Sequence, residues 1–162
     1  MSVITHARGK SRLATMIDAA GGVSVGVALA QARENIEAMR AQAMAVVDAQ
    51  IVLLEAVPQP GSIEEQAGRI GEAYRAANGV IDAASPFELL DLCRAAAGLC
   101  DILDNAPADK PFDWRIVTVH ARALKLLQTL PLEQADSRAA VLDSLRQVVE
   151  RKSAPRPPTS TL

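Results

Sequence analysis

One apolar repeat, which runs through residues 24–57 without a proline before Pro58, constrains this chain more than any other sequence feature. Along this stretch apolar residues return at alternating intervals of four and three positions. A mean period of 3.5 residues is typical of a helix that packs lengthwise against another helix. We call the repeat the heptad seam, and its positions are Val25, Leu29, Ala32, Ile36, Met39, Ala43, Val46, Gln50, Leu53 and Val57.

A continuous helix over 24–57 would be about 50 Å long, which exceeds the width of a compact small domain. Part of the seam therefore needs a partner, which is either another helix of this chain or a second copy. We expect a homodimer through the 24–57 helix, although the sequence leaves open which of the two fills the seam. Gln50 is the polar seam residue, and it either fixes the register of the contact or marks a solvated end.

The composition favours an all-α fold. Hydrophobic residues make up 49% of the chain but aromatic residues only 2%, so Ala, Leu and Val supply most of the apolar volume. Alanine is the best helix former, and strand signals are absent from the sequence. We predict a basic N-terminal segment with a short helix at 1–22, a long helix and return helix forming a hairpin at 23–83, a compact three-helix unit at 84–152, and a disordered tail at 153–162.

Capping residues divide the chain into individual helices. We expect helices to start at Ser24, at Ser62 with Glu65 three residues later, and at Ser85 with Pro86 and Glu88. The expected ends are Pro58, the pair Asn78–Gly79, a turn at 105–111 and a break at Pro131.

Charge and cysteine usage exclude several classes of protein. The net charge of −2 argues against non-specific nucleic-acid binding, and no apolar run is long enough to span a membrane. Cys93 and Cys100 would lie two turns apart on one helix, about 10 Å along its axis, which is too far for a disulfide. We therefore expect buried thiols in a cytoplasmic protein.

The residues suggest no catalytic chemistry. The sequence holds two histidines and lacks a phosphate-binding loop, a nucleophile motif and a zinc motif. Glu64 and Glu65 suit the first turn of a helix, and Asp101 with Asp104 lacks a third ligand nearby. We expect no catalytic residue, no cofactor site and no metal site, and hence a protein that is not an enzyme.

His120 is the candidate for phosphorylation. Helical phosphotransfer domains carry an exposed reactive histidine, with a lysine three residues later that stabilises phosphate charge. In this chain Ala123 occupies that position and Lys125 follows two residues further on, on a different side of the helix. We therefore weigh an atypical phosphotransfer domain against a packed histidine at the edge of an apolar stripe, and we favour the packed histidine.

A candidate partner-binding surface lies around Phe112, Trp114 and Arg115, where the single tryptophan stands at a predicted helix start. Aromatic and arginine side chains often dominate the binding energy of interfaces. The alternative interpretation places Trp114 in the core.

Several phrases of the sequence taken together resemble a known family. They are Ser11-Arg12-Leu13, Gly21-Gly22-Val23-Ser24-Val25, Asp91-Leu92-Cys93, Leu99-Cys100-Asp101-Ile102-Leu103-Asp104, Phe112-Asp113-Trp114, Val119-His120 and Ala123-Leu124-Lys125-Leu126-Leu127. The combination, which extends to about Gln128, resembles the CheE proteins encoded in chemotaxis gene clusters of alphaproteobacteria. The resemblance implies a cytoplasmic accessory of chemotaxis signalling, with response regulators or other chemotaxis proteins as partners, and it transfers no catalytic residue.

We therefore expect a non-enzymatic adaptor or regulator of bacterial chemotaxis or two-component signalling that acts through protein–protein contacts. One alternative is a phasin-like protein that coats storage granules, because long alanine-rich amphipathic helices also adsorb to lipid or polymer surfaces. The other alternative is the atypical histidine phosphotransfer domain that uses His120.

Overall fold

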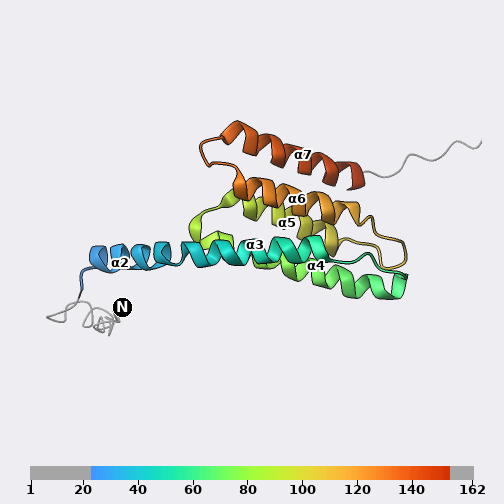
Figure 1. Ribbon diagram of the computed structural model, residues 1–162, viewed down its shortest axis with the longest axis horizontal. Helices are drawn as coiled ribbons and strands as arrows, with labels where there is room; N and C mark the ends of the chain where they lie inside the picture. The colour runs from blue at the N-terminus through green and yellow to red at the C-terminus, as the bar shows by residue number, and fades with distance from the viewer. Residues whose placement is uncertain (1–22, 154–162) are drawn as a thin grey trace, which may run out of the picture. The chain divides into compact units, whose positions relative to one another are not determined.

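The computed structural model describes residues 23–153, which contain helices and no β-strand. The all-α prediction is therefore confirmed. The predictions for 1–22, and for the tail beyond Ser153, lie outside the described residues. The elements are α2 (Val25–Ala38), α3 (Arg40–Ala56), α4 (Ile63–Ala84), the 3₁₀ helix η1 (Ser85–Phe87), α5 (Leu90–Asp104), α6 (Arg115–Thr129) and α7 (Ala135–Ser153) (Figure 1).

The predicted continuous helix over 24–57 is wrong, because it is interrupted at Met39. Met39 has φ −88° and ψ −7°, and it separates α2 from α3. Neither proline nor glycine lies at this position, and nothing in the neighbouring residues explains the interruption. The predicted start is confirmed, since the Ser24 hydroxyl accepts a hydrogen bond of 3.3 Å from the Val27 N–H.

The chain divides into one unit over Met1–Glu37 and a second over Ala38–Leu162.

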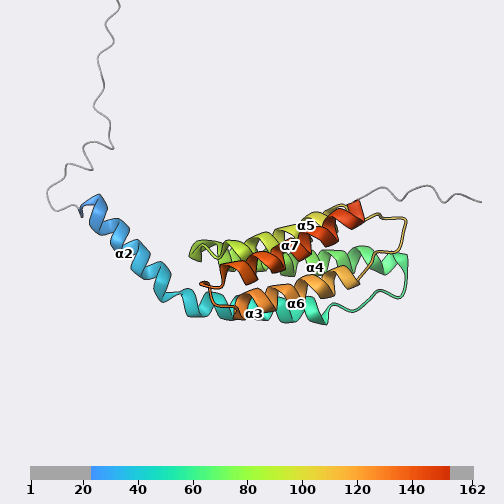
Figure 2. The same ribbon diagram turned by 90° about the horizontal axis from the view of Figure 1, so that it is seen from above.

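Helices α3 to α6 surround the core of the second unit. Helix α3 packs on α4 and α6, α5 packs on the same two helices, and α7 lies against α5 and α6 (Figures 1 and 2). The predicted hairpin and the predicted three-helix unit thus share one core and do not form two separate ones. Its fully buried large side chains include Val47, Ile51, Leu54, Val80, Leu92, Leu99, Leu124 and Leu127.

Helix α4 starts where the capping box predicts. The Ser62 hydroxyl accepts from the Glu65 N–H at 3.4 Å, and the Glu65 carboxylate accepts from the Gly61 N–H at 3.0 Å. The predicted end at Asn78–Gly79 is wrong, because α4 continues to Ala84. Val80 and Ala84 are fully buried in the core. Their packing offsets the cost of an interior glycine, which is about 1 kcal/mol relative to alanine.

The predicted helix start at Ser85 is also wrong. Ser85–Phe87 forms the 3₁₀ turn η1, and Glu88 adopts a left-handed conformation with φ 55°. Helix α5 begins at Leu90, and no side chain caps it. The reversal at Glu88 separates α4 from α5, and the cap predicted from Ser85 and Glu88 does not form. The predicted turn at 105–111 and the break at Pro131 are confirmed, since α6 begins at Arg115 and α7 at Ala135.

Two buried polar side chains hold the connections between helices. Gln66 of α4 donates from its amide to the carbonyls of Pro107 and Lys110, at 3.2 and 3.0 Å, and accepts from the Phe112 N–H at 2.8 Å. The backbone of the α5–α6 connection is thus satisfied by a residue of a distant helix. Arg138 plays the corresponding part at the start of α7. It donates to the carbonyls of Leu127 and Leu130, both at 2.7 Å, and to the Asp91 carboxylate at 2.8 Å.

Candidate interaction surfaces on α2 and α3

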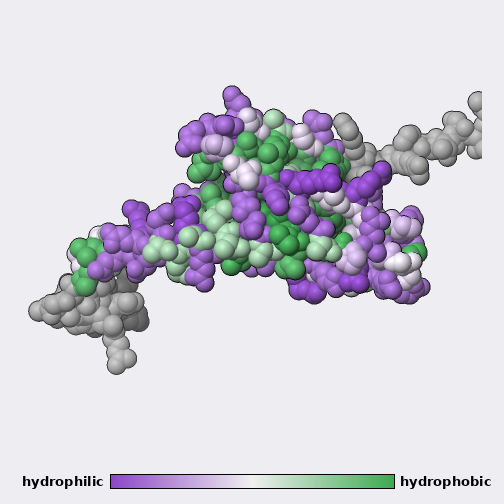
Figure 3. Space-filling model, in the orientation of Figure 1, coloured by the Kyte–Doolittle hydropathy of each residue, from purple (hydrophilic) through white to green (hydrophobic). Residues whose placement is uncertain are grey.

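The side of α3 that faces away from the core is largely apolar. Ten residues of α3 are exposed, and only Gln42, Asp48 and Glu55 among them are polar. A helix at the surface of a globular protein normally presents polar side chains on this side, and a helix that is apolar all round is normally buried. Figure 3 shows the resulting band of apolar side chains over α3. We call it the outer face of α3, which consists of Ala41, Ala45, Val46, Ala49, Val52, Leu53 and Ala56.

The heptad seam is only partly filled within the chain. The residues of α3 that enter the core are Val47, Ile51 and Leu54, which lie beside the seam and not on it. One row of the seam, Ala43, Gln50 and Val57, is half-buried. The other row, Met39, Val46 and Leu53, is exposed, and Leu53 retains 54% of its accessible surface. We call the half-buried row the inner row and the exposed row the outer row.

The inner row of α3 lies against α4 at a point of close approach. A Cβ atom at Gly79 would lie 2.9 Å from the Gln50 side-chain carbonyl carbon, so glycine lets the two helices approach here. Beside this contact is an open groove of about 460 Å³, lined by Gln50 and Leu53 of α3, by Val57 directly after it, and by Glu72, Arg75 and Ala76 of α4. Gln50 therefore contacts α4 of its own chain, while Leu53 borders an open groove.

Helix α2 buries none of its residues. Its large apolar side chains, Val25, Val27, Leu29 and Ile36, are all exposed, with Ala32 between them on the seam. It has 14 residues, and isolated helices shorter than about 12–15 residues are only marginally stable in water. The exposed apolar side chains of α2 are therefore available to pack against another helix.

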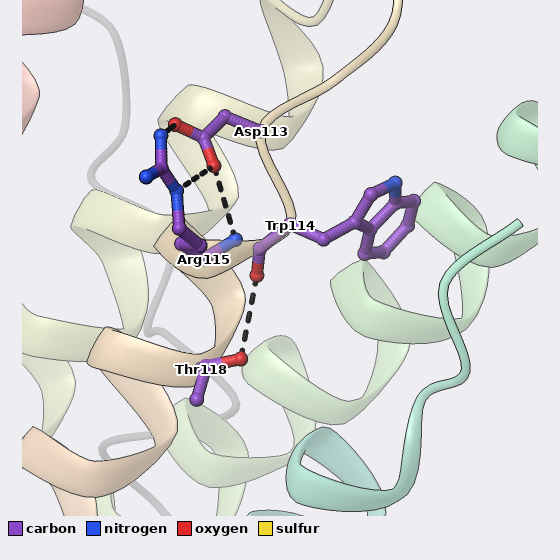
Figure 4. Close-up of polar contacts among 4 residues, drawn as sticks. All are labelled: Asp113, Trp114, Arg115 and Thr118. Atoms are coloured by element: carbon purple, nitrogen blue, oxygen red, sulfur yellow. Dashed lines mark hydrogen bonds and ion pairs between the residues drawn. The ribbon is translucent and has the colours of Figure 1, made fainter.

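The structure does not present the three residues of the predicted partner-binding surface, Phe112, Trp114 and Arg115, side by side at the surface. Trp114 is 8% exposed and belongs to the core, which was the alternative interpretation of the sequence. Its indole points away from the exposed Arg115 guanidinium, which forms an ion pair with Asp113 at 2.9 Å (Figure 4). The half-buried Phe112 ring contacts the indole edge-on, with ring centroids 5.3 Å apart. Trp114 therefore packs the α6 start against the core and is not a surface anchor.

His120 is fully buried on α6. Its Nδ1 lies 2.9 Å from the Ile116 carbonyl oxygen, and its Nε2 has no hydrogen-bond partner among the described residues. Burial lowers the pKa of the imidazole, and the bond to Ile116 opposes this shift. The structure thus contains the packed histidine, and the exposed imidazole that phosphotransfer requires is missing. The Lys125 ammonium lies 3.9 Å from the Glu55 carboxylate of α3.

The cysteines and acidic residues do not combine into a reactive site. Cys93 is half-buried, Cys100 is buried, and both are free thiols. Burial raises the pKa of both thiols, which lowers their thiolate fraction and their reactivity. Among residues 23–153 no group of three or more His, Cys, Asp or Glu side chains could hold a metal ion. Within the same range no helix is both long and apolar enough to cross a membrane.

Sequence reasoning found the apolar repeat on α2 and α3 but missed the two buried polar residues, Gln66 and Arg138. Their partners are mainly backbone carbonyls of distant loops, which leave no periodic signal in the sequence. The most unusual surfaces of the described residues are two separate apolar ones, α2 and the outer face of α3. No protein-family model, curated protein or solved structure matches the chain.

Proposed function

We propose that this chain is a non-enzymatic interaction protein that self-associates through α2 and α3. The observation that carries the proposal is the outer face of α3, which is apolar on the side opposite the core. Helix α2 supports it, because none of its apolar side chains is buried. A protein whose function is to bind other helices needs such a surface.

The apolar side chains at this surface are large enough to drive association. Full burial of a Val, Leu or Ile side chain contributes about 1.5–3 kcal/mol. Val46, Leu53, Leu29 and Ile36 each keep between 41% and 54% of their surface exposed. Two copies would bury eight such side chains, about 1 kcal/mol each, which is enough to offset a large part of the cost of association.

We further propose that the self-associated protein acts as a cytoplasmic adaptor or regulator in bacterial chemotaxis or two-component signalling. The resemblance to CheE proteins supports this role and names response regulators or other chemotaxis proteins as partners. The burial of His120 favours a role through protein contacts over phosphotransfer, because a phosphoryl donor cannot reach a fully buried imidazole.

Light scattering after size-exclusion chromatography tests self-association. The wild-type chain should elute with the mass of a dimer, and Leu53→Glu should elute as a monomer with unchanged helicity. Leu90→Glu is the matched control, because Leu90 is 56% exposed, close to the 54% of Leu53, but lies in the first turn of α5. A monomeric wild-type protein would overturn the proposal. Dissociation by Leu90→Glu as well would show that the outer face of α3 is not the contact.

The adaptor role requires a separate test with purified chemotaxis response regulators and calorimetric titration. We expect saturable binding that Leu90→Glu leaves unchanged. A dimer that binds none of these regulators would remain an interaction protein, but it would contradict the role in chemotaxis. Binding of the wild-type chain to lipid vesicles or polyester granules, with loss of the dimer, would favour the phasin-like alternative.

A further inference from the structure

We infer that α2 of one copy packs antiparallel on the outer face of α3 of a second copy. The inference rests on the proposed self-association and specifies which surfaces meet and in which direction. It follows from the seam rows that are free on each helix and from the way in which two helices with a heptad pattern combine.

The two helices differ in the rows they leave free. On α2 both rows of the seam are exposed, one with Val25 and Ala32 and the other with Leu29 and Ile36. On α3 only the outer row is exposed, because the inner row is half-buried and Gln50 lies against Gly79 of α4. A partner helix can therefore reach the outer row of α3 but not the whole seam.

The direction follows from this difference. In a parallel pair each row packs against the same row of the other copy, so α2 would bring only Val25 and Ala32 to the partner's outer row. Reversing one helix exchanges the two rows, so that the Leu29 and Ile36 row of α2 meets the partner's outer row. Antiparallel pairing therefore places the larger side chains of α2 on the row that α3 leaves free, and it buries more apolar surface there.

The spacing of the two free rows also matches. Leu29 and Ile36 are separated by seven residues, as are Val46 and Leu53, which is about 10.5 Å along either helix. In the antiparallel register Leu29 contacts the partner's Leu53, and Ile36 contacts the partner's Val46. Ala49 lies between Val46 and Leu53 on the outer face of α3, and its small side chain lets the partner helix approach closely.

A second copy is the occupant that satisfies both surfaces at once. In its described residues each copy has one helix, α2, without buried residues and one exposed apolar face, the outer face of α3. If α2 of each copy packs on α3 of the other, both surfaces are covered and the contact closes as a two-fold dimer. An unrelated partner on the outer face of α3 would leave α2 exposed.

Disulfide trapping tests the pairing. A background with Cys93→Ala and Cys100→Ala removes the native thiols, and its helicity and mass are compared with those of the wild-type chain before use. Leu29→Cys and Leu53→Cys chains that carry different tags are mixed, allowed to exchange and oxidised. A disulfide forms only when the two Cα atoms come within about 7 Å, so the mixed 29–53 product should exceed either homodimeric product several-fold. Val27→Cys mixed with Leu53→Cys is the control, because Val27 is exposed on α2 but lies off the seam.

The outcomes separate this inference from the proposal beneath it. If light scattering gives a monomer for the background, the proposed self-association fails, and the inference fails with it. If the background is a dimer but Leu29→Cys alone forms the dominant disulfide, α2 packs on α2 of the second copy and only the inference is overturned. A dimer without the mixed 29–53 disulfide, or with equal trapping at Val27, overturns the inference as well.

Discussion

Arg138 is the residue on which the start of α7 depends. Its guanidinium is 4% exposed and forms hydrogen bonds with Asp91 and with the carbonyl oxygens of Leu127 and Leu130. Arginine suits this place because its planar fork can serve several acceptors at once. From the sequence alone Arg138 is one of many charged residues on a polar helix, since its acceptors belong to α5 and to the end of α6.

We expect Arg138→Leu to lower the free energy of unfolding by about 2–4 kcal/mol, because it leaves one carboxylate and two carbonyl groups without their donor. Urea denaturation measures the loss. Arg146→Leu is the control on the same helix, since the Arg146 side chain is 65% exposed and its ion pair with Asp143 contributes less than about 1 kcal/mol. Equal losses for the two variants would contradict the structural role of Arg138.

His120 makes stability depend on pH in a predictable direction. Burial lowers its pKa below the ordinary value of 6.5, so below pH 6.5 the unfolded chain binds a proton that the folded chain refuses. The free energy of unfolding should therefore fall as the pH drops from 7.5 to 5.5, by up to about 1.4 kcal/mol per pH unit from this residue. Arg94 of α5 and Asp143 and Arg146 of α7 line the cavity beside the imidazole.

Urea denaturation of the wild-type chain and of His120→Gln at pH 5.5, 6.5 and 7.5 measures this effect. The difference between the two proteins should change with pH, because His120 is the only titratable group in which they differ. Parallel pH curves would show that the imidazole is protonated equally well in the folded and unfolded states, which is incompatible with its burial.

At the scale of the elements, local signals predicted most helices but misplaced boundaries that depend on packing. The Ser62–Glu65 capping box and the break at Pro131 depend on local chemistry and were readable from the sequence. The extension of α4 past Gly79 was not, because it depends on contacts that the sequence does not show. The pair Asn78–Gly79 is typical of a helix end, but Gly79 lies inside α4, at the point where α3 and α4 approach each other.

A double-mutant cycle at Gln50 and Gly79 tests this interpretation. In the wild-type background the Cβ of Gly79→Ala would displace the Gln50 side chain, which offsets the gain in helix propensity. In a Gln50→Ala background the obstacle is absent, so Gly79→Ala should be more favourable by about 1 kcal/mol. Gly68→Ala on the same helix is the control, because no atom lies within 4 Å of its Cβ position and its effect should be equal in both backgrounds. Additive effects at Gln50 and Gly79 would contradict the close approach.

At the scale of the whole molecule the heptad repeat predicted that α2 and α3 are helical, but it did not predict which surface packs against each side of these helices. The period reports which residues share a side of a helix, not what covers that side. The chain packs Gln50 of the inner row against α4 and uses Val47, Ile51 and Leu54, next to the seam, for its core. Likewise the sequence left open whether Trp114 lies at the surface or in the core, because its burial depends on the packing of α6 on the other helices.

If α2 is held only by a second copy, its backbone should be protected in proportion to dimer concentration. Amide exchange over residues 25–38 should slow as the protein concentration rises through the dissociation constant, because binding shifts the equilibrium away from the frayed helix. Exchange in α5, which lies in the core of each copy, should not depend on concentration. Leu29→Glu should abolish the concentration dependence in α2 and leave α5 unchanged, and hydrogen exchange followed by mass spectrometry resolves both segments. Protection of α2 that is constant down to concentrations at which the protein is a monomer would mean that α2 is held within its own chain, because only an intermolecular contact is lost on dilution.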